Sequence, residues 1–291
     1  MKVLSLFDGI SCARVALKKA GIEVEQYYAS EIDKYAIQVS KKRWPTIRHL
    51  GDVKTVAEQF TYAKEGHIDL LIGGSPCQDL SIAKKNRKGL DGERSGLFWE
   101  YLNILRRLKP KYFILENVAS MPKEDRDVIT RELGVEPIMI DAGLVSAQTR
   151  RRLFWTNIEG VKQPKDRGLY LRDILEEDGI DITEQVKKKI KGTLSYQKTY
   201  GNMRTIDEKA KTLTASGQNI SNTGATNISK GGRVRKLTPK ECERLQGLPD
   251  GYTKYGDDGG WSKVDISNAQ RYKMLGNAFH VDVVAHILKH I

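Results

Sequence analysis

The stretch that decides the fold is Lys2-Val3-Leu4-Ser5-Leu6-Phe7-Asp8-Gly9-Ile10-Ser11, where a short apolar run meets a polar turn. The run has the length and composition of a buried strand. Gly9 lets the main chain of the turn approach a ligand closely, because glycine has no Cβ. The stretch therefore predicts the first strand of an α/β sheet, with a candidate binding turn at its carboxyl end.

Short apolar runs continue to alternate with amphipathic stretches up to about Thr156. This alternation is typical of the strands and crossover helices of a parallel α/β sheet, which binds ligands at the carboxyl ends of its strands. The spacing predicts strands at 3–7, 27–30, 69–73, 112–116 and 153–156. It predicts helices at 15–20, 34–42 and 97–108, and another that begins near Pro122.

The pattern changes after Asn157, where apolar periodicity weakens and residues 216–227 are rich in Ser, Thr, Asn and Gly. Regular pattern returns at Thr238-Pro239, with Thr238 as the predicted cap of a helix. An apolar-faced helix through Val281, Val284 and Leu288 closes the chain. We therefore predict one lobe from residues 1–157 and 233–291, with residues 158–232 inserted as a smaller, loop-rich region.

The composition excludes several classes of protein. A hydrophobic share of 39% and a charged share of 30% are those of a soluble globular protein, and no apolar run approaches the roughly 20 residues of a membrane helix. The first residues lack the pattern of a signal peptide, so we expect a cytoplasmic location and no contact with a membrane. Cys12, Cys77 and Cys242 are too widely spaced to form a CxxC metal site, and their odd number argues against a disulfide framework.

Positive charge is concentrated in one part of the chain. The net charge is +12, and residues 183–236 contain twelve Lys and Arg against three Asp and Glu. This concentration favours a polyanionic partner such as nucleic acid. A solvated loop is the competing interpretation for the run Lys187–Lys189.

A candidate nucleophile lies in Gly73-Gly74-Ser75-Pro76-Cys77-Gln78, after a predicted buried strand. A cysteine thiol is already partly thiolate at pH 7, although an inert, buried cysteine is the competing interpretation. Glu116 favours the catalytic interpretation, because it ends another predicted strand and so lies at the same edge of the sheet. A carboxyl group there can hydrogen-bond ring N3 and the amino group of a cytosine, which makes carbon 6 electrophilic.

Three further features lie near the same predicted edge. Glu31 follows the second strand, where a carboxylate can accept hydrogen bonds from ribose hydroxyls, and Gly51-Asp52 follows a possible third. In residues 148–152, which read QTRRR, alternate side chains share one face if the segment is extended. Guanidinium groups held there suit phosphate and carbonyl oxygens.

Taken in order, these motifs resemble those of the cytosine-5 DNA methyltransferase family over nearly the whole chain. Two departures stand out: Ser11 replaces a glycine common in bacterial members, and GGSPC replaces their GFPC. Both variants resemble the eukaryotic de novo DNA methyltransferases, so we expect altered packing around the cofactor and retained binding. The matching motifs are FDG, Glu31, GDV, SPCQ, ENV, QTRRR, RKLTPKECERLQGLP and GNA at Gly276-Asn277-Ala278.

The resemblance implies a Rossmann-like α/β methyltransferase sheet, with residues 158–232 as the target-recognition region. It implies Cys77 as the nucleophile and Glu116 as the contact to the base edge. Arg152, with Arg150, is implied near the cytosine carbonyl. No metal is needed. The cofactor S-adenosyl-L-methionine is implied beside Phe7, Gly9, Glu31, Asp52, Val53, Pro76, Leu97 and Asn277.

The implied reaction adds the Cys77 thiolate to carbon 6 of cytosine, methylates carbon 5 and expels the thiolate as the carbon 5 proton leaves. The base must be flipped out of duplex DNA, the expected partner. The basic residues within 81–94 are a candidate lid over phosphates, with a solvated loop as the alternative. We expect a monomer, and a cognate restriction endonuclease only as a functional partner.

Three rival functions remain. A branch of the family methylates transfer RNA, which the basic insertion would also suit, although SPCQ and the size of the insertion favour DNA. A binding protein with an inactive catalytic lobe is disfavoured by the presence of Cys77, Glu116 and both arginines. A nicotinamide-dependent dehydrogenase is disfavoured because the GxGxxG fingerprint is absent.

Overall fold

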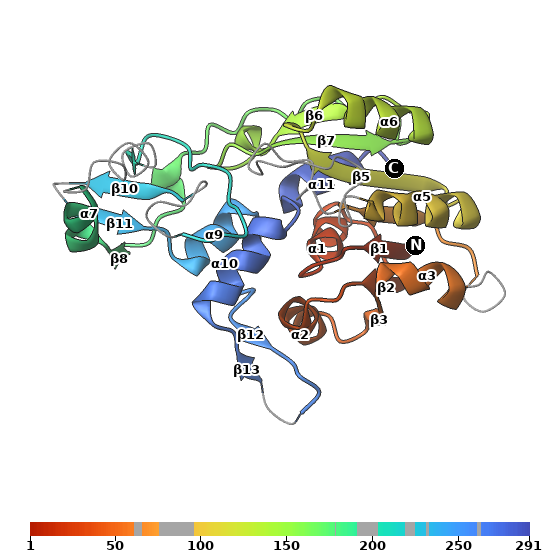
Figure 1. The fold of residues 1–291 in the computed structure, drawn as a ribbon, viewed down its shortest axis with the longest axis horizontal. Helices are drawn as coiled ribbons and strands as arrows, with labels where there is room; N and C mark the ends of the chain where they lie inside the picture. Colours follow the sequence, from red (N-terminus) through yellow and green to blue (C-terminus); the bar gives the residue numbers. More distant parts are fainter. Residues whose placement is uncertain are drawn as a thin grey trace. The chain divides into compact units, whose positions relative to one another are not determined.

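The computed structural model describes residues 1–60, 66–75, 96–177, 179–190, 203–218, 225–230, 233–260 and 263–291. The chain forms two compact units (Figure 1). Unit 1 consists of Met1–Ile140, Arg151–Gln163 and Val283–Ile291. Unit 2 consists of Asp141–Arg150 and Pro164–Asp282.

A seven-stranded sheet in the order β3-β2-β1-β4-β5-β7-β6 forms the centre of unit 1. The pairs from β3 to β5 are parallel, whereas β7 runs antiparallel to β5. The strands are β1 (Lys2–Leu6), β2 (Gln26–Ser30), β3 (Arg48–Gly51), β4 (Leu70–Gly73), β5 (Tyr112–Val118), β6 (Ile138–Asp141) and β7 (Arg151–Thr156).

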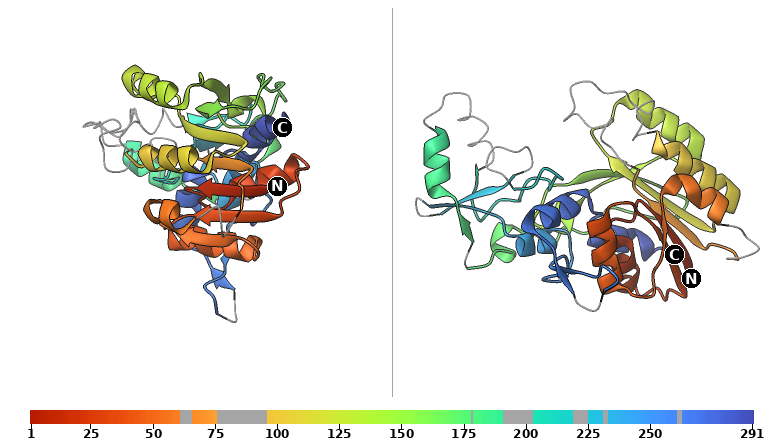
Figure 2. Two further views of the ribbon diagram at one scale, coloured as in Figure 1. Left: turned by 90° about the vertical axis from the view of Figure 1, so that its right-hand side faces the viewer. Right: turned by 60° about the horizontal axis from the view of Figure 1, so that its bottom comes forward.

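Helices cover both faces of this sheet (Figure 2). On one face, α3 (Val53–Gln59), α5 (Leu97–Leu108) and α6 (Lys123–Leu133) pack on the strands. Their apolar side chains, among them Phe98 and Tyr101, share one core with Leu4, Leu71 and Trp155 of the sheet. The opposite face carries α1 (Cys12–Lys19), α2 (Lys34–Arg43) and α11 (Val281–Leu288).

Most predicted elements of unit 1 are confirmed. The helix at 97–108 has the expected bounds, and the strand predicted at 27–30 ends at Ser30. The prediction of a parallel sheet is wrong for the strand at 153–156, since β7 is antiparallel to its neighbour β5. That direction places the start of β7 beside the end of β5, because antiparallel neighbours run in opposite senses.

Unit 2 contains a smaller sheet in the order β8-β11-β10-β9. Helix α7 (Thr183–Ile190) packs on it through Val186, which contacts Ile182 and Val234. Val234 alternates with Arg233 and Arg235 along β11, so the two arginines lie on the opposite face of the strand. The strands are β8 (Ile180–Asp181), β9 (Met203–Arg204), β10 (Asn227–Lys230) and β11 (Arg233–Lys236).

The rest of unit 2 consists of helices, a two-stranded sheet and irregular segments. Helix α9 (Pro239–Leu245) begins at the predicted cap: Thr238 Oγ1 accepts from the Glu241 N–H, and the Glu241 carboxylate accepts from the Thr238 N–H. This capping box ties both ends of its first turn. The other elements are the 3-10 helices Ala142–Leu144 and Leu171–Asp173, the pair β12 (Tyr255–Gly256) and β13 (Val264–Asp265), and α10 (Asn268–Asn277).

The compact units do not follow the predicted lobes. Residues 233–282, expected with the first lobe, cluster in unit 2 together with residues 141–150. Buried hydrogen bonds explain this grouping, since Gln148 Nε2 donates to the Leu245 carbonyl at 2.6 Å and to Gln246 Oε1 at 3.2 Å. The functional division, with residues 158–232 as the recognition region, stays a prediction.

Two absences concern the described part of the chain alone. None of its helices combines the length and the apolar character that crossing a membrane requires. No three His, Cys, Asp or Glu side chains among the described residues are grouped so that they could hold a metal ion.

Candidate functional site

Glu116 and Arg152 form an ion pair at one edge of the unit 1 sheet. In the antiparallel register Glu116 faces Phe154 and Val118 faces Arg152, so the two charged residues lie diagonally across the strands. Arg152 Nε lies 2.7 Å from Glu116 Oε1, and each side chain is 14% exposed. The pair is therefore partly shielded from water yet open to a ligand at this edge.

The predicted nucleophile Cys77 and its neighbour Pro76 lie outside the described residues, as does the predicted lid at 81–94. The strand before them is β4, which ends at Gly73 as expected. Gly73 pairs with Leu115, the residue before Glu116. The chain therefore leaves β4 toward Cys77 at the edge of the sheet where Glu116 lies.

A second group of predicted residues meets at the carboxyl ends of β1 and β2. The Gly9 N–H donates to Glu31 Oε2 at 2.8 Å. Glu31 Oε1 accepts from the N–H groups of Ile32 and Asp33, each at 2.8 Å. A carboxylate offers about four acceptor positions, so three N–H donors orient it and still leave capacity for a hydroxyl group.

The turn at Phe7–Ser11 has an unusual main-chain conformation. Phe7 has φ 57°, Gly9 has φ 59° and Ser11 has φ 59°, so three alternate residues are left-handed. A Cβ atom built on Gly9 would meet no heavy atom within 4 Å, which leaves open space above the turn. Ile32, beside Glu31, is 73% exposed. An exposed apolar residue beside a carboxylate suits the flat ring and the ribose of a nucleoside, so Ile32 is a further candidate residue, which the sequence analysis did not name.

The other residues implied around the cofactor occupy three places. Asp52 caps α3, with Oδ1 accepting from the Lys54 N–H at 3.0 Å, and Val53 begins that helix. Leu97 begins α5 and packs on the unit 1 core. Asn277 ends α10 in unit 2 and is exposed, between the buried residues Gly276 and Ala278.

Arg150 has surroundings that the sequence analysis did not predict. It is 3% exposed, and its guanidinium donates to main-chain carbonyls of unit 2. Nη1 donates to Leu213 at 2.9 Å, and Nη2 donates to Gly276 at 3.2 Å and Ala278 at 2.9 Å. These contacts make Arg150 a structural residue of unit 2, and its implied place near a cytosine carbonyl stays a prediction.

The two described cysteines are both buried. Burial raises the pKa of the Cys242 thiol, and the neighbouring carboxylates Glu241 and Glu243 act in the same direction. A thiol in such surroundings is inert, because the thiolate is the reactive form. Cys12 lies in the first turn of α1, in the core of unit 1.

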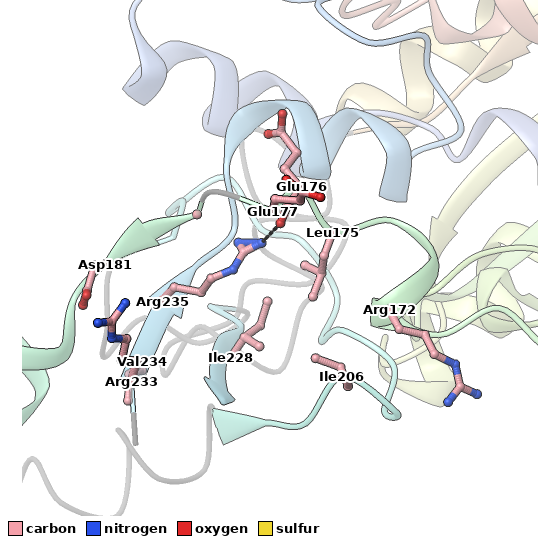
Figure 3. Close-up of a pocket in the computed structure, with 11 residues that line it drawn as sticks. Arg172, Leu175, Glu176, Glu177, Asp181, Ile206, Ile228, Arg233, Val234 and Arg235 are labelled. Atoms are coloured by element: carbon pink, nitrogen blue, oxygen red, sulfur yellow. Dashed lines mark hydrogen bonds between the residues drawn. The ribbon is translucent and has the colours of Figure 1, made fainter. Parts of the chain in front are cut away.

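A cavity of about 530 Å³ lies beside the small sheet of unit 2 (Figure 3). Arg235 projects into it from β11 and donates to the Glu176 carbonyl at 3.0 Å and to the buried Glu241 carboxylate. Arg244, which lies on the same helix as Glu241, pairs instead with Asp250 at 2.6 Å. Arg233, also at the cavity, is exposed.

Comparison with known proteins gives matches along the whole chain. Residues 1–158 and 156–291 match the family model for C-5 cytosine-specific DNA methylase. The chain is 29% identical to the type II methyltransferase M.HhaI of Haemophilus parahaemolyticus, over 100% of this chain and 94% of that protein. It is 32% identical to the orphan methyltransferase M.Rho11sI of Bacillus phage rho11s, over 66% of this chain but only 38% of that protein.

Among solved structures, the chain is similar to Dnmt2 methyltransferase of S. pombe, with a TM-score of 0.74 and 20% identity. The match covers 99% of this chain and 97% of that one. At this level of identity the likeness concerns the fold, and it extends over both units.

Proposed function

Since the chain belongs to the C-5 cytosine-specific DNA methylase family, we propose that it transfers a methyl group from S-adenosyl-L-methionine to carbon 5 of a flipped-out cytosine in a specific sequence of duplex DNA. Family membership makes the chain a DNA cytosine-5 methyltransferase. The donor, the flipped base, the specific sequence and the roles of individual residues are the proposal. The observation that carries it is the pair Glu116–Arg152 at the edge of the sheet.

The residues at the ends of β1 and β2 fit the proposed cofactor. The oriented carboxylate of Glu31 would accept hydrogen bonds from the ribose hydroxyls, and Ile32 would pack against adenine. The open space at Gly9 would admit the rest of the cofactor. Phe7, Asp52, Val53, Pro76, Leu97 and Asn277 enter through the resemblance. When bound, S-adenosyl-L-methionine supplies an electrophilic methyl group.

Glu116 and Arg152 would act on the base. The Glu116 carboxyl group would hydrogen-bond N3 and the amino group of cytosine, while the Arg152 guanidinium would donate to the carbonyl at carbon 2. Holding N3 protonated makes carbon 6 electrophilic, so a bond forms between it and the Cys77 thiolate. Carbon 5 then gains nucleophilic character and accepts the methyl group. Loss of the carbon 5 proton restores the double bond and breaks the bond to sulfur, which returns Cys77 as thiolate.

The proposed DNA contact lies in the basic part of unit 2. The excess of Lys and Arg over residues 183–236 would neutralise phosphates, and the exposed Arg233 is one candidate contact. The side chains of Lys187–Lys189 are not among those that the structure describes. Binding should weaken steeply as salt is added, because phosphate contacts release counterions.

The covalent step can be tested with duplex DNA that carries 5-fluorocytosine at the target. After methyl transfer the carbon 5 position holds fluorine where a proton must leave, so the enzyme should stay attached through Cys77 after denaturation. Cys77→Ala should form no adduct, whereas Cys12→Ala and Cys242→Ala serve as matched controls and should still form it. Attachment at another residue would overturn the mechanism, and trapping on single-stranded RNA with little on duplex DNA would replace DNA by RNA as the substrate.

A further inference from the structure

A chain of buried polar groups lies at the Phe7–Ser11 turn, and the proposed mechanism does not use it. Asp8 is at its centre and is 4% exposed. Its Oδ1 accepts from the Tyr27 hydroxyl at 2.6 Å, and its Oδ2 accepts from the Ser11 hydroxyl at 2.5 Å. A carboxyl group this buried is costly without partners, so the two hydroxyl groups determine where it can lie.

The chain continues away from the turn to two neighbouring elements. The Ser11 and Ser40 hydroxyls are 2.6 Å apart, and Ser40 Oγ lies 3.4 Å from His49 Nε2. Ser40 belongs to α2, His49 to β3 and Tyr27 to β2. The polar chain therefore connects the turn after β1 with the two strands that Glu31 and Asp52 follow.

Ser11 gives the turn a strain that needs an explanation. Its φ of 59° is a conformation that is unfavourable for residues other than glycine and that persists only where the surroundings enforce it. The hydroxyl of Ser11 is held between Asp8 and Ser40. These hydrogen bonds offset the main-chain strain, which a glycine at this position would not have. The main chain adds to this hold, because the Ser11 N–H donates to the Asp8 carbonyl at 3.1 Å.

The same turn presents Gly9, whose N–H orients the Glu31 carboxylate. We propose that Asp8 is a positioning residue for the cofactor, which fixes the turn so that Gly9 and Glu31 are held in one arrangement. This inference rests on the proposed function through the assignment of Gly9 and Glu31 to S-adenosyl-L-methionine. Asp8 itself acts from below the turn, through the hydroxyls of Tyr27 and Ser11.

The pKa values of Asp8 and His49, at the two ends of these hydrogen bonds, agree with this role. Burial raises the pKa of Asp8 to about 6, and the charge of Glu31 acts in the same direction against the hydroxyl groups, which lower it. At the other end, burial and then the charge of Lys41 lower the pKa of His49 to about 4, so its ring is neutral at pH 7. Asp8 can thus carry a proton without a change in the charge of His49.

Hydroxyl groups both donate and accept, so the hydrogen bonds from Asp8 to Ser40 can run in either direction. A protonated Asp8 would donate to Ser11, which would then donate to Ser40. Asparagine imitates this form, because its oxygen accepts from Tyr27 while its amide group donates to Ser11. Asp8→Asn therefore retains the chain, whereas Asp8→Leu keeps a similar volume and removes it.

The test is calorimetric titration of the protein, residues 1–291, with S-adenosylhomocysteine, with melting temperatures recorded for each variant. Asp8→Asn should bind within about threefold of the wild type, and Asp8→Leu should bind at least about tenfold more weakly. The same pair is then compared in the Glu31→Ala background. If Asp8 acts through the Gly9–Glu31 contact, the loss caused by Asp8→Leu should shrink by at least about threefold there.

Tyr27→Phe is a milder variant for the case in which Asp8→Leu does not fold. It removes one hydroxyl from Asp8 and should weaken binding by about threefold or more in the wild-type background only. Wild-type affinity in Tyr27→Phe, or equal losses of affinity in both backgrounds, would show that these buried hydrogen bonds support only the fold. Either result would overturn the inference. Failure of the wild type to bind, or an unchanged affinity in Glu31→Ala, would instead refute the cofactor site and the inference with it.

Discussion

Arg150 and Arg152 are two residues apart, yet their guanidinium groups have different partners. Arg152 pairs with Glu116 at the edge of the sheet, whereas Arg150 is buried against three carbonyl groups. Lysine keeps the charge but cannot reproduce the planar array of donors. The two substitutions to lysine should therefore affect different properties of the protein.

Arg152→Lys should lower single-turnover methyl transfer on the order of 100-fold with little change in melting temperature, because an oriented donor to the base is lost. Arg150→Lys should instead reduce the free energy of unfolding by about 2 to 4 kcal/mol, because buried carbonyls lose their partner. Arg151→Lys is the matched control, since Arg151 is exposed and should change neither. If Arg150→Lys keeps wild-type stability and loses only methyl transfer, Arg150 acts at the base.

The raised pKa of Asp8 predicts how the free energy of unfolding depends on pH. Its pKa of about 6 in the folded protein lies above 3.8, so the folded state binds the proton more tightly than the unfolded chain. The resulting stabilisation is complete below pH 3.8 and disappears as pH rises through about 6. The difference between the two pKa values corresponds to about 3 kcal/mol.

Asp8→Asn lacks this titration. The wild type should therefore lose about 2.4 kcal/mol of unfolding free energy relative to Asp8→Asn between pH 4 and pH 7, as measured by urea unfolding at each pH. Comparing the two proteins cancels the titration of groups that they share. A difference that stays constant over this range would place the folded pKa of Asp8 near its ordinary value.

At the scale of elements, Gly276 determines how α10 packs within unit 2. A Cβ atom there would lie 2.1 Å from the Thr214 carbonyl carbon and 2.4 Å from the Ala215 nitrogen. Both are main-chain atoms, so they cannot turn aside as a side chain would. The absence of a side chain at Gly276 is thus required for the helix to reach this segment.

Gly276→Ala should shift the urea midpoint of unfolding downward, with a loss of about 1 to 3 kcal/mol or more from overpacking. Lys273→Ala on the same helix is the control, because Lys273 is exposed and alanine favours helix formation. Equal midpoints for the two variants would mean that residues 214–215 move away at little cost.

The elements of unit 1 could be predicted because each carries a local signal. Apolar runs and helical spacing specify its strands and helices, and in unit 2 Thr238-Pro239 specifies a helix cap in the same way. The direction of β7 carries no such signal, since Leu153, Phe154 and Trp155 are apolar whichever way the strand runs. The strands β8 and β9 are two residues long, too short to show periodicity.

The candidate site could be predicted in part, for a related reason. Glu31 follows a predicted strand and Glu116 ends one, which are local patterns, and the edge of a sheet collects such residues. Partners depend on packing instead. Glu241 pairs with Arg235 of β11 and not with Arg244 on its own helix, and Asp8 finds Tyr27 on β2, contacts that no spacing along the chain specifies.

At the scale of the whole molecule, the chain passes between its two units at residues 140–141, 150–151, 163–164 and 282–283. Residues 164–282 alone would therefore lack Gln148 and Arg150. We expect that fragment to melt without a cooperative transition, because buried carbonyls such as Leu213 and Leu245 lose their donors. Residues 141–282 should melt cooperatively by circular dichroism, and the double variant Gln148→Ala, Arg150→Ala of that longer fragment is the control. A cooperative transition in residues 164–282 alone would contradict this.

This route of the chain also has a mechanical consequence. Met1 and Ile291 both belong to unit 1, where β1 and α11 anchor them. If the molecule is stretched between these two residues, the tension first passes through the packing of β1 and α11, and unit 2 carries no load until one of them detaches. Unit 2 is thereby shielded from pulling, and the force needed to open the molecule is the rupture force of unit 1.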